Sequence, residues 1–201
     1  RSKGNWVGLT LRARIIVFDK RKFTKEDFST YSDLGKPIFK NEFCSRSVTH
    51  PYMLSLLSSL ILNLGENKAT NLSKNLVMNQ ARKPQGGDTD QIRAVGAGEC
   101  GVALTNSYYL IRLMRSSKPR DIESVKNVGF VFPNQKTSGT HINVTGAGIL
   151  KNAPNLTNAN LFLEFLTEPE TQKLFASGNN EWPAIQGLAT SNKILNKLSK
   201  F

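Results

Sequence analysis

Two adjacent tyrosines, Tyr108 and Tyr109, stand where an apolar run of the sequence gives way to a helical pattern. Asn106 or Ser107 can cap that helix, so its first-turn N–H groups and the positive end of its dipole favour phenolate over phenol. Arg112 lies one helical turn after Tyr108 and can reach an anion or a phenolate held near that end. Two interpretations follow. The phenols belong to an oxygen-rich metal site, or they are interfacial aromatics with one ring buried and one hydroxyl in water.

The composition is that of a globular protein with an excess of positive charge. The 201 residues, 39% of them hydrophobic and 21% charged, suffice for one large domain or two small lobes. The 27 Lys and Arg against 15 Asp and Glu give a formal net charge of +12, which suits nucleic acid, an anionic membrane or an anionic small ligand. The basic residues are scattered, and their densest run, residues 19–22, has no interleaved aromatics. We therefore expect no nucleic-acid partner.

The elements that must position the tyrosines alternate between strands and helices. Strand patterns cover residues 13–18, 42–45, 100–104, 128–133 and 140–145, and helical patterns cover residues 24–27, 51–62, 68–79, 89–97, 158–166, 170–177 and 193–201, besides the helix of the tyrosine pair. This alternation predicts an α/β architecture and leaves its topology open. The most apolar stretch, residues 52–62, is interrupted by serines and falls short of a membrane span.

Residues typical of catalysis are few. His50 and His141 are the two imidazoles of the chain, and neither stands in a zinc-binding spacing or a nucleophile elbow. Cys44 and Cys100 do not form a Cys-x-x-Cys motif. We therefore expect a protein that is not an enzyme.

The glycine-containing loop at residues 83–91 does not make a phosphate-binding loop. Gly86 and Gly87 are not followed by the Lys-Ser/Thr ending that such a loop requires, which argues against nucleotide binding. Asp88 and Asp90 are close enough to be a pair of carboxylates. We interpret them instead as helix-capping residues, with Asp88 at the start of the helix that follows.

Several separated motifs occur in order along the chain. They are RKPQG at residues 82–86, DQIRAV at residues 90–95, the tyrosine pair with its arginine, FPNQ at residues 132–135 and GTHINVTGAG at residues 139–148. Together with the Arg-Ser pair ahead of Tyr52, they resemble the ferric-ion-binding periplasmic proteins of bacterial ABC iron importers, in the tyrosine-rich cyanobacterial-type subgroup. The resemblance covers nearly the whole chain.

The resemblance implies a site for Fe3+ made from Tyr52, Tyr108 and Tyr109. Hard phenolate oxygens suit ferric iron, and three phenolates balance its three positive charges. Whether an anion such as carbonate completes the site stays open. Three further residues are implied beside the ligands or the anion: Arg46, His50 and Arg112.

The implied fold is the type II periplasmic binding-protein architecture, in which crossing strands join two α/β lobes. Residues 19–133 would form a complete second lobe that carries the tyrosines. Residues 1–18 and 134–201 would form a partial first lobe, because the N-terminal part of the family chain has no counterpart here. We expect the exposed apolar surface of this first lobe to make the chain self-associate.

The implied function is capture of ferric iron in the cleft between the lobes and delivery to an inner-membrane ABC permease. Such a protein works in the periplasm, and the chain begins at Arg1 without a signal peptide. A protein of the same fold that binds another small anion or a polyamine is the alternative, and a basic nucleic-acid-binding module is a remote one.

The inferred compartment also bears on Cys44 and Cys100. Both precede segments that lead to the tyrosines, and an oxidising periplasm favours a disulfide between them. Two buried thiols that do not meet remain the alternative.

Overall fold

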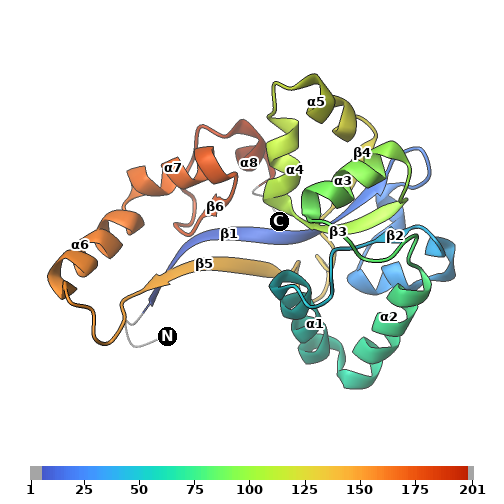
Figure 1. Cartoon of the computed structure of the whole chain (residues 1–201), viewed down its shortest axis with the longest axis horizontal. Helices are drawn as coiled ribbons and strands as arrows, with labels where there is room; N and C mark the ends of the chain where they lie inside the picture. The colour runs from blue at the N-terminus through green and yellow to red at the C-terminus, as the bar shows by residue number, and fades with distance from the viewer. Residues whose placement is uncertain (1–5, 199–201) are drawn as a thin grey trace. The chain divides into compact units, whose positions relative to one another are not determined.

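The computed structural model describes residues 6–198 and shows the mixed α/β architecture that the sequence predicts. The described residues fall into two compact units. Residues 13–141 form one, here the central unit, and residues 6–12 with 142–198 form the other, here the terminal unit. Strand β1 (Trp6–Asp19) contributes its first half to the terminal unit and its second half to the central unit (Figure 1).

The central unit is built on a four-stranded sheet with the strand order β2-β3-β1-β4. The three shorter strands are β2 (Phe43–Cys44), β3 (Val102–Asn106) and β4 (Val128–Val131). Strand β1 runs antiparallel to β3 and β4, with Ile16 opposite Leu104 and Val131, whereas β2 runs parallel to β3. Residues 14–18 of β1 are buried on both faces because helices cover both sides of the sheet.

Two groups of helices cover the two faces of this sheet (Figure 1). Helices α1 (Pro51–Leu64) and α2 (Glu66–Met78) lie on one side together with the 3-10 turns η1 (Lys25–Asp27), η2 (Tyr31–Gly35) and η3 (Pro37–Phe39). Helices α3 (Asp88–Ala97), α4 (Ser107–Met114) and α5 (Pro119–Val125) lie on the other. No helix within residues 6–198 is long and apolar enough to cross a membrane.

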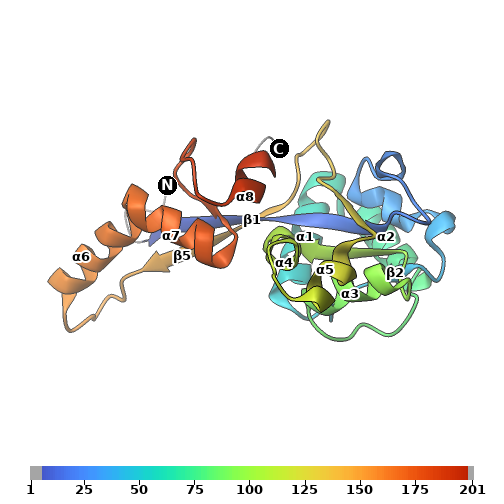
Figure 2. The same cartoon turned by 90° about the horizontal axis from the view of Figure 1, so that it is seen from above.

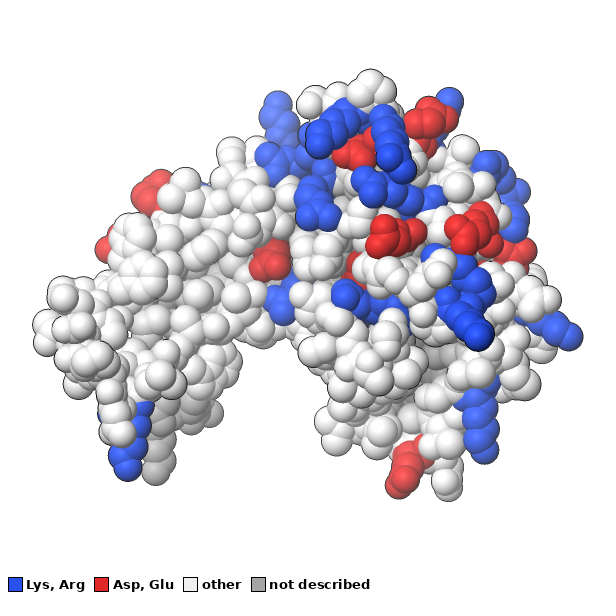
Figure 3. Space-filling model, in the orientation of Figure 1, with Lys and Arg blue, Asp and Glu red and all other residues white. Residues whose placement is uncertain are grey.

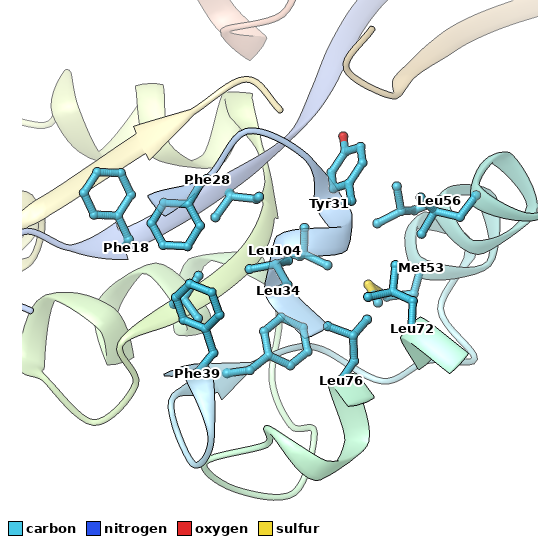
Figure 4. Packing of buried hydrophobic residues seen from close by; sticks show 14 of the residues in the cluster. Phe18, Phe28, Tyr31, Leu34, Phe39, Met53, Leu56, Leu72, Leu76 and Leu104 are labelled. Carbon is cyan, nitrogen blue, oxygen red and sulfur yellow. The ribbon is translucent and has the colours of Figure 1, made fainter. Parts of the chain in front are cut away.

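The main hydrophobic core lies between the sheet and α1, α2 and the 3-10 turns (Figure 4). Phe28 stacks between Phe18 and Phe39, with ring centroids 5.1 and 5.2 Å away. Met53 and Leu56 of α1 and Leu72 and Leu76 of α2 close the cluster. Aromatic rings of this size contribute most of the apolar area that a core buries, so this cluster holds α1, and Tyr52 with it, against the sheet.

The two cysteines are joined by a disulfide, with their Cα atoms 5.9 Å apart. Cys44 lies on β2, and Cys100 lies just before β3, the strand that pairs with β2. The structure therefore contains the predicted pairing and not two separate thiols. The bond ties the edge strand that leads to Arg46 to the strand that leads to the tyrosine pair.

The terminal unit contains strands β5 (Ile142–Gly148) and β6 (Trp182–Pro183), which pair with β1, and helices α6 (Leu156–Thr167), α7 (Pro169–Asn179) and α8 (Lys193–Leu198). In both views β5 runs beside the first part of β1 (Figure 1 and Figure 2). Helix α6 has no buried residue, and Leu161 and Phe162 are each 59% exposed. An apolar face on α6 is thus open to solvent within the described residues.

Several sequence-based boundaries differ from the structure. The helical opening at residues 24–27 is a single 3-10 turn, and the strand expected at residues 140–145 starts at Ile142 and continues to Gly148. Helix α5 and strand β6 were not predicted. The predicted helix at residues 193–201 is present up to Leu198, and its last three residues lie outside the described ones.

Basic and acidic side chains are interspersed on the face shown in Figure 3. Lys and Arg are concentrated over the central unit, where acidic groups lie among them. Some basic side chains of the central unit form ion pairs with acidic ones, such as Arg93 with Asp121 and Lys22 with Glu42. On this face the positive charge of the chain is therefore not gathered into a purely basic stripe.

Candidate metal centre

Three of the four tyrosines converge at the N-terminal ends of two helices. Tyr52 belongs to the first turn of α1, and Tyr108 and Tyr109 belong to the first turn of α4. The hydroxyl oxygens of Tyr52 and Tyr108, 56 residues apart in sequence, are 3.3 Å apart. The rings of Tyr108 and Tyr109 are 4.0 Å apart between centroids, at an interplanar angle of 31°. All three side chains are partly buried and partly exposed.

Helix α1 starts at this cluster because His50 and Pro51 fix its first turn. His50 is the N-cap residue, and its Nδ1 accepts the backbone N–H of Tyr52 at 3.2 Å. Pro51 at the first helical position has a φ angle suited to the helix. The His50 ring contacts the Tyr52 ring, with centroids 4.6 Å apart. Burial, and next the positive charge of Arg46, lower the pKa of His50, which favours the neutral imidazole that this capping bond needs.

An arginine guanidinium lies over each of two tyrosine rings. The Cζ atom of Arg46 is 5.2 Å from the centroid of Tyr52, and that of Arg112 is 5.2 Å from the centroid of Tyr109. Arg112 also donates to Oγ1 of Thr89 at 2.8 Å. The sequence spacing put Arg112 on the same helix face as Tyr108. In the structure its guanidinium lies over the ring of Tyr109 and donates to Thr89 of the neighbouring helix α3. Both positions suit attraction to an electron-rich ring.

Helix α4 starts at Ser107 after the N-cap residue Asn106, but neither of the predicted side-chain caps is used there. Asn106 occupies the N-cap position without a capping bond, and its Oδ1 instead accepts Nη1 of Arg14 at 3.1 Å. The Oγ of Ser107 accepts the backbone N–H of Ala13 at 3.2 Å. Both side chains therefore fix the start of α4 to strand β1.

Asp88 has a different role from the capping that the sequence suggested. The N-cap of α3 is Gly87, whose N–H is accepted by the carboxylate of Asp90 at 2.7 Å. Asp88 is completely buried and accepts Nη1 of Arg14 at 2.5 Å. The capping interpretation of Asp88 was wrong because its partner lies 74 residues earlier. A signal was present, since an arginine within the apolar strand at residues 13–18 requires a buried anion.

The surroundings of Tyr108 oppose the phenolate that the start of α4 was expected to favour, and they keep the phenol protonated when no metal is bound. Burial raises the pKa of Tyr108 first, and the hydroxyl groups of Tyr109 and Tyr52 raise it further. A cation beside the oxygen would oppose this by favouring the phenolate. Within residues 6–198 no group of three His, Cys, Asp or Glu side chains is arranged to hold a metal ion.

His141, the other imidazole considered from sequence, contacts α1 at Ser55, one helical turn after Tyr52. Its Nε2 is 2.9 Å from Oγ of Ser55, and its backbone carbonyl accepts the N–H of Arg14. His50 thus contacts Tyr52, and His141 joins α1 to the segment that precedes β5.

The chain belongs to the family of bacterial extracellular solute-binding proteins, whose model matches residues 1–200. It is 41% identical over 191 residues to iron uptake protein A1 and 45% identical over 187 residues to iron uptake protein A2, both of Synechocystis. These matches cover 95% and 92% of this chain and 53% and 54% of the two relatives. The chain thus spans about half the length of these curated relatives.

Solved structures show the same likeness. A Trichodesmium protein in complex with iron and citrate is 46% identical and matches with a TM-score of 0.88, over 92% of this chain and 59% of that one. Apo FutA2 of Synechocystis is 42% identical and matches with a TM-score of 0.92, over 98% of this chain and 63% of that one. The ferric binding protein of Campylobacter jejuni is 38% identical, with a TM-score of 0.90, over 98% and 62%. The chain therefore has the fold of the corresponding part of these type II periplasmic proteins.

Proposed function

We propose that this chain is part of a periplasmic protein that binds ferric iron and that Tyr52, Tyr108 and Tyr109 supply phenolate ligands. The carrying observation is the convergence of three phenols from two helix N-termini, with two hydroxyl oxygens 3.3 Å apart. The names of the relatives support the choice of metal, since they describe iron uptake and ferric iron-binding proteins.

The chemistry of the cluster fits a trivalent hard cation. Three phenolates carry three negative charges and cancel those of Fe3+, which removes the cost of burying a net charge. Arg46 and Arg112 lie over the rings of two of these tyrosines, and their positive charge suits an anion such as carbonate that completes the coordination. His50 uses Nδ1 to cap α1, so we assign it to holding Tyr52 and not to the metal.

Iron is the cargo in this proposal, and no bond of a substrate is made or broken. Residues 19–133 act as the lobe that carries the tyrosines, and residues 1–18 with 134–201 act as part of the other lobe. The boundaries lie close to those of the two compact units, which divide after Arg12 and after His141. Iron is held in the cleft between lobes and handed to an inner-membrane ABC permease.

The test is titration of the metal-free chain with ferric iron while the visible spectrum is recorded. We expect a phenolate-to-iron charge-transfer band that Tyr108→Phe and Tyr109→Phe weaken strongly and Tyr52→Phe also weakens. Tyr31→Phe is the matched control, because Tyr31 is buried in the core and its hydroxyl donates to the backbone carbonyl of Arg14. Full colour and unchanged affinity in all three ligand variants would refute the assignment.

A further inference from the structure

A buried ion cluster lies directly behind the tyrosines. Asp88 and Arg14 are both completely buried, and the side chain of Arg46 is 13% exposed. Oδ2 of Asp88 accepts Nη1 of Arg14 at 2.5 Å and the backbone N–H of Asn106 at 2.7 Å, while Oδ1 accepts Nη1 of Arg46 at 3.3 Å. One carboxylate therefore holds two guanidinium groups and one backbone donor.

Each of these donors leads directly to a tyrosine. Arg46 lies over the ring of Tyr52, and Asn106 is the N-cap of the helix that begins with Ser107, Tyr108 and Tyr109. Arg14 also donates to the side chain of Asn106 at 3.1 Å, and its Nη2 lies 3.2 Å from the sulfur of Met53, the residue after Tyr52. Asp88 thus connects the starts of α1 and α4, the two helices that bring the phenol oxygens together.

The free energy that the buried ion pair contributes indicates that the pair fixes the geometry of the site. A buried ion pair contributes little net stability, since removing both charges from water costs about as much as their attraction returns. Met53, whose sulfur contacts Arg14, belongs to the hydrophobic core cluster, so apolar side chains pack well beside the pair. An ion pair at this place is better explained by the geometry that it imposes than by stability alone.

We propose that Asp88 is a positioning residue for the binding of ferric iron. Asp88 acts by holding Arg46 against Tyr52 and by holding the start of α4 beside Tyr52. This inference rests on the proposed function. Asp88 also balances one of the two positive charges that stand behind a site for a trivalent cation. Loss of its charge would free Arg46 and leave two guanidinium groups opposing the metal.

The experiment is a double-mutant cycle with Asp88→Asn and Arg46→Gln, measured by Fe3+ affinity and by the position of the charge-transfer band. We expect each single variant to lower affinity by about tenfold or more, as loss of an outer partner of a metal ligand typically does. The double variant should be no weaker than Asp88→Asn alone, because both changes remove the same contact. Asp90→Asn is the control: it neutralises a carboxylate two residues away that only caps α3.

A readout on the metal-free protein accompanies the cycle. Near-ultraviolet circular dichroism of the tyrosines should change in the same way in Asp88→Asn and Arg46→Gln and should stay unchanged in Asp90→Asn. A shared shift of the charge-transfer band would support the positioning role, because a loss of stability alone lowers the unfolding temperature without moving the band.

Independent losses that multiply in the double variant would overturn the inference. So would an Arg46→Gln variant with unchanged affinity and band position, and this outcome decides the question even if Asp88→Asn does not fold, since Arg46 lies at the edge of the cluster. A wild-type chain that shows no charge-transfer band would instead refute the proposed function, and the positioning role with it.

Discussion

Breaking the disulfide between Cys44 and Cys100 should destabilise the central unit strongly. The bond closes a loop across a sequence separation of 56 residues, and the chain-entropy relation gives a stabilisation of roughly 4 kcal/mol for that length. Globular domains are stable by about 5–15 kcal/mol, so this is a large share of the total. For a chain of this size we expect a fall in the unfolding temperature of roughly 10 °C. Strand β2 is two residues long and pairs with β3 alone among the named strands, so the bond crosses the edge of the sheet at its shortest strand.

Urea unfolding with and without a reductant measures this effect. The double variant Cys44→Ala and Cys100→Ala is the control, because it should be as unstable as the reduced wild type and insensitive to reductant. Iron affinity should fall as well, since the bond anchors the strand that leads to Arg46 and Tyr52. Two free thiols per chain in the denatured, unreduced protein, or an unfolding curve that reductant does not move, would refute this reasoning.

Three further predictions concern the cap, the core and the surface. His50→Ala removes the cap of α1 and should cost about 1 kcal/mol of stability, with a smaller loss of iron affinity than Tyr52→Phe; a titration with a larger loss would make His50 a ligand. Burial raises the pKa of Tyr31 above its ordinary value of 10.0, so at higher pH the unfolded chain releases a proton that the folded chain keeps. Stability of the metal-free protein should therefore fall as pH rises above about 10, less so in Tyr31→Phe, and identical pH profiles in chemical unfolding would contradict this. The exposed side chains Leu161 and Phe162 should make this chain self-associate, and replacing both by Ser should reduce it; sedimentation of the wild type as a monomer at every concentration would exclude it.

Local signals in the sequence located most elements of the central unit. Helix α1 was expected at residues 51–62 and spans Pro51–Leu64, because a proline at its start and Gly65 after its end mark the boundaries in the sequence itself. Helix α5 escaped prediction because its seven residues, PRDIESV, contain only Ile122 and Val125 as aliphatic side chains, too few to establish an apolar period. Strand β6 has two residues, too few for an alternating pattern, and pairing with β1 defines it.

The sequence predicted the tyrosines of the cluster better than it predicted the charged residues that support them. Tyr108 and Tyr109 drew attention as neighbours, and Tyr52 joined them through the resemblance of separate motifs to one family. Asp88 was misinterpreted because a local rule, an acidic residue at a helix start, already explained it. The position of Arg14 within the apolar run of β1 predicts that an anion is buried nearby. Which of the 15 acidic residues pairs with Arg14 depends on how β1, α3 and β3 pack. Sequence patterns therefore identify groups that a ligand can reach, whereas the charges that hold those groups in place are determined by long-range contacts.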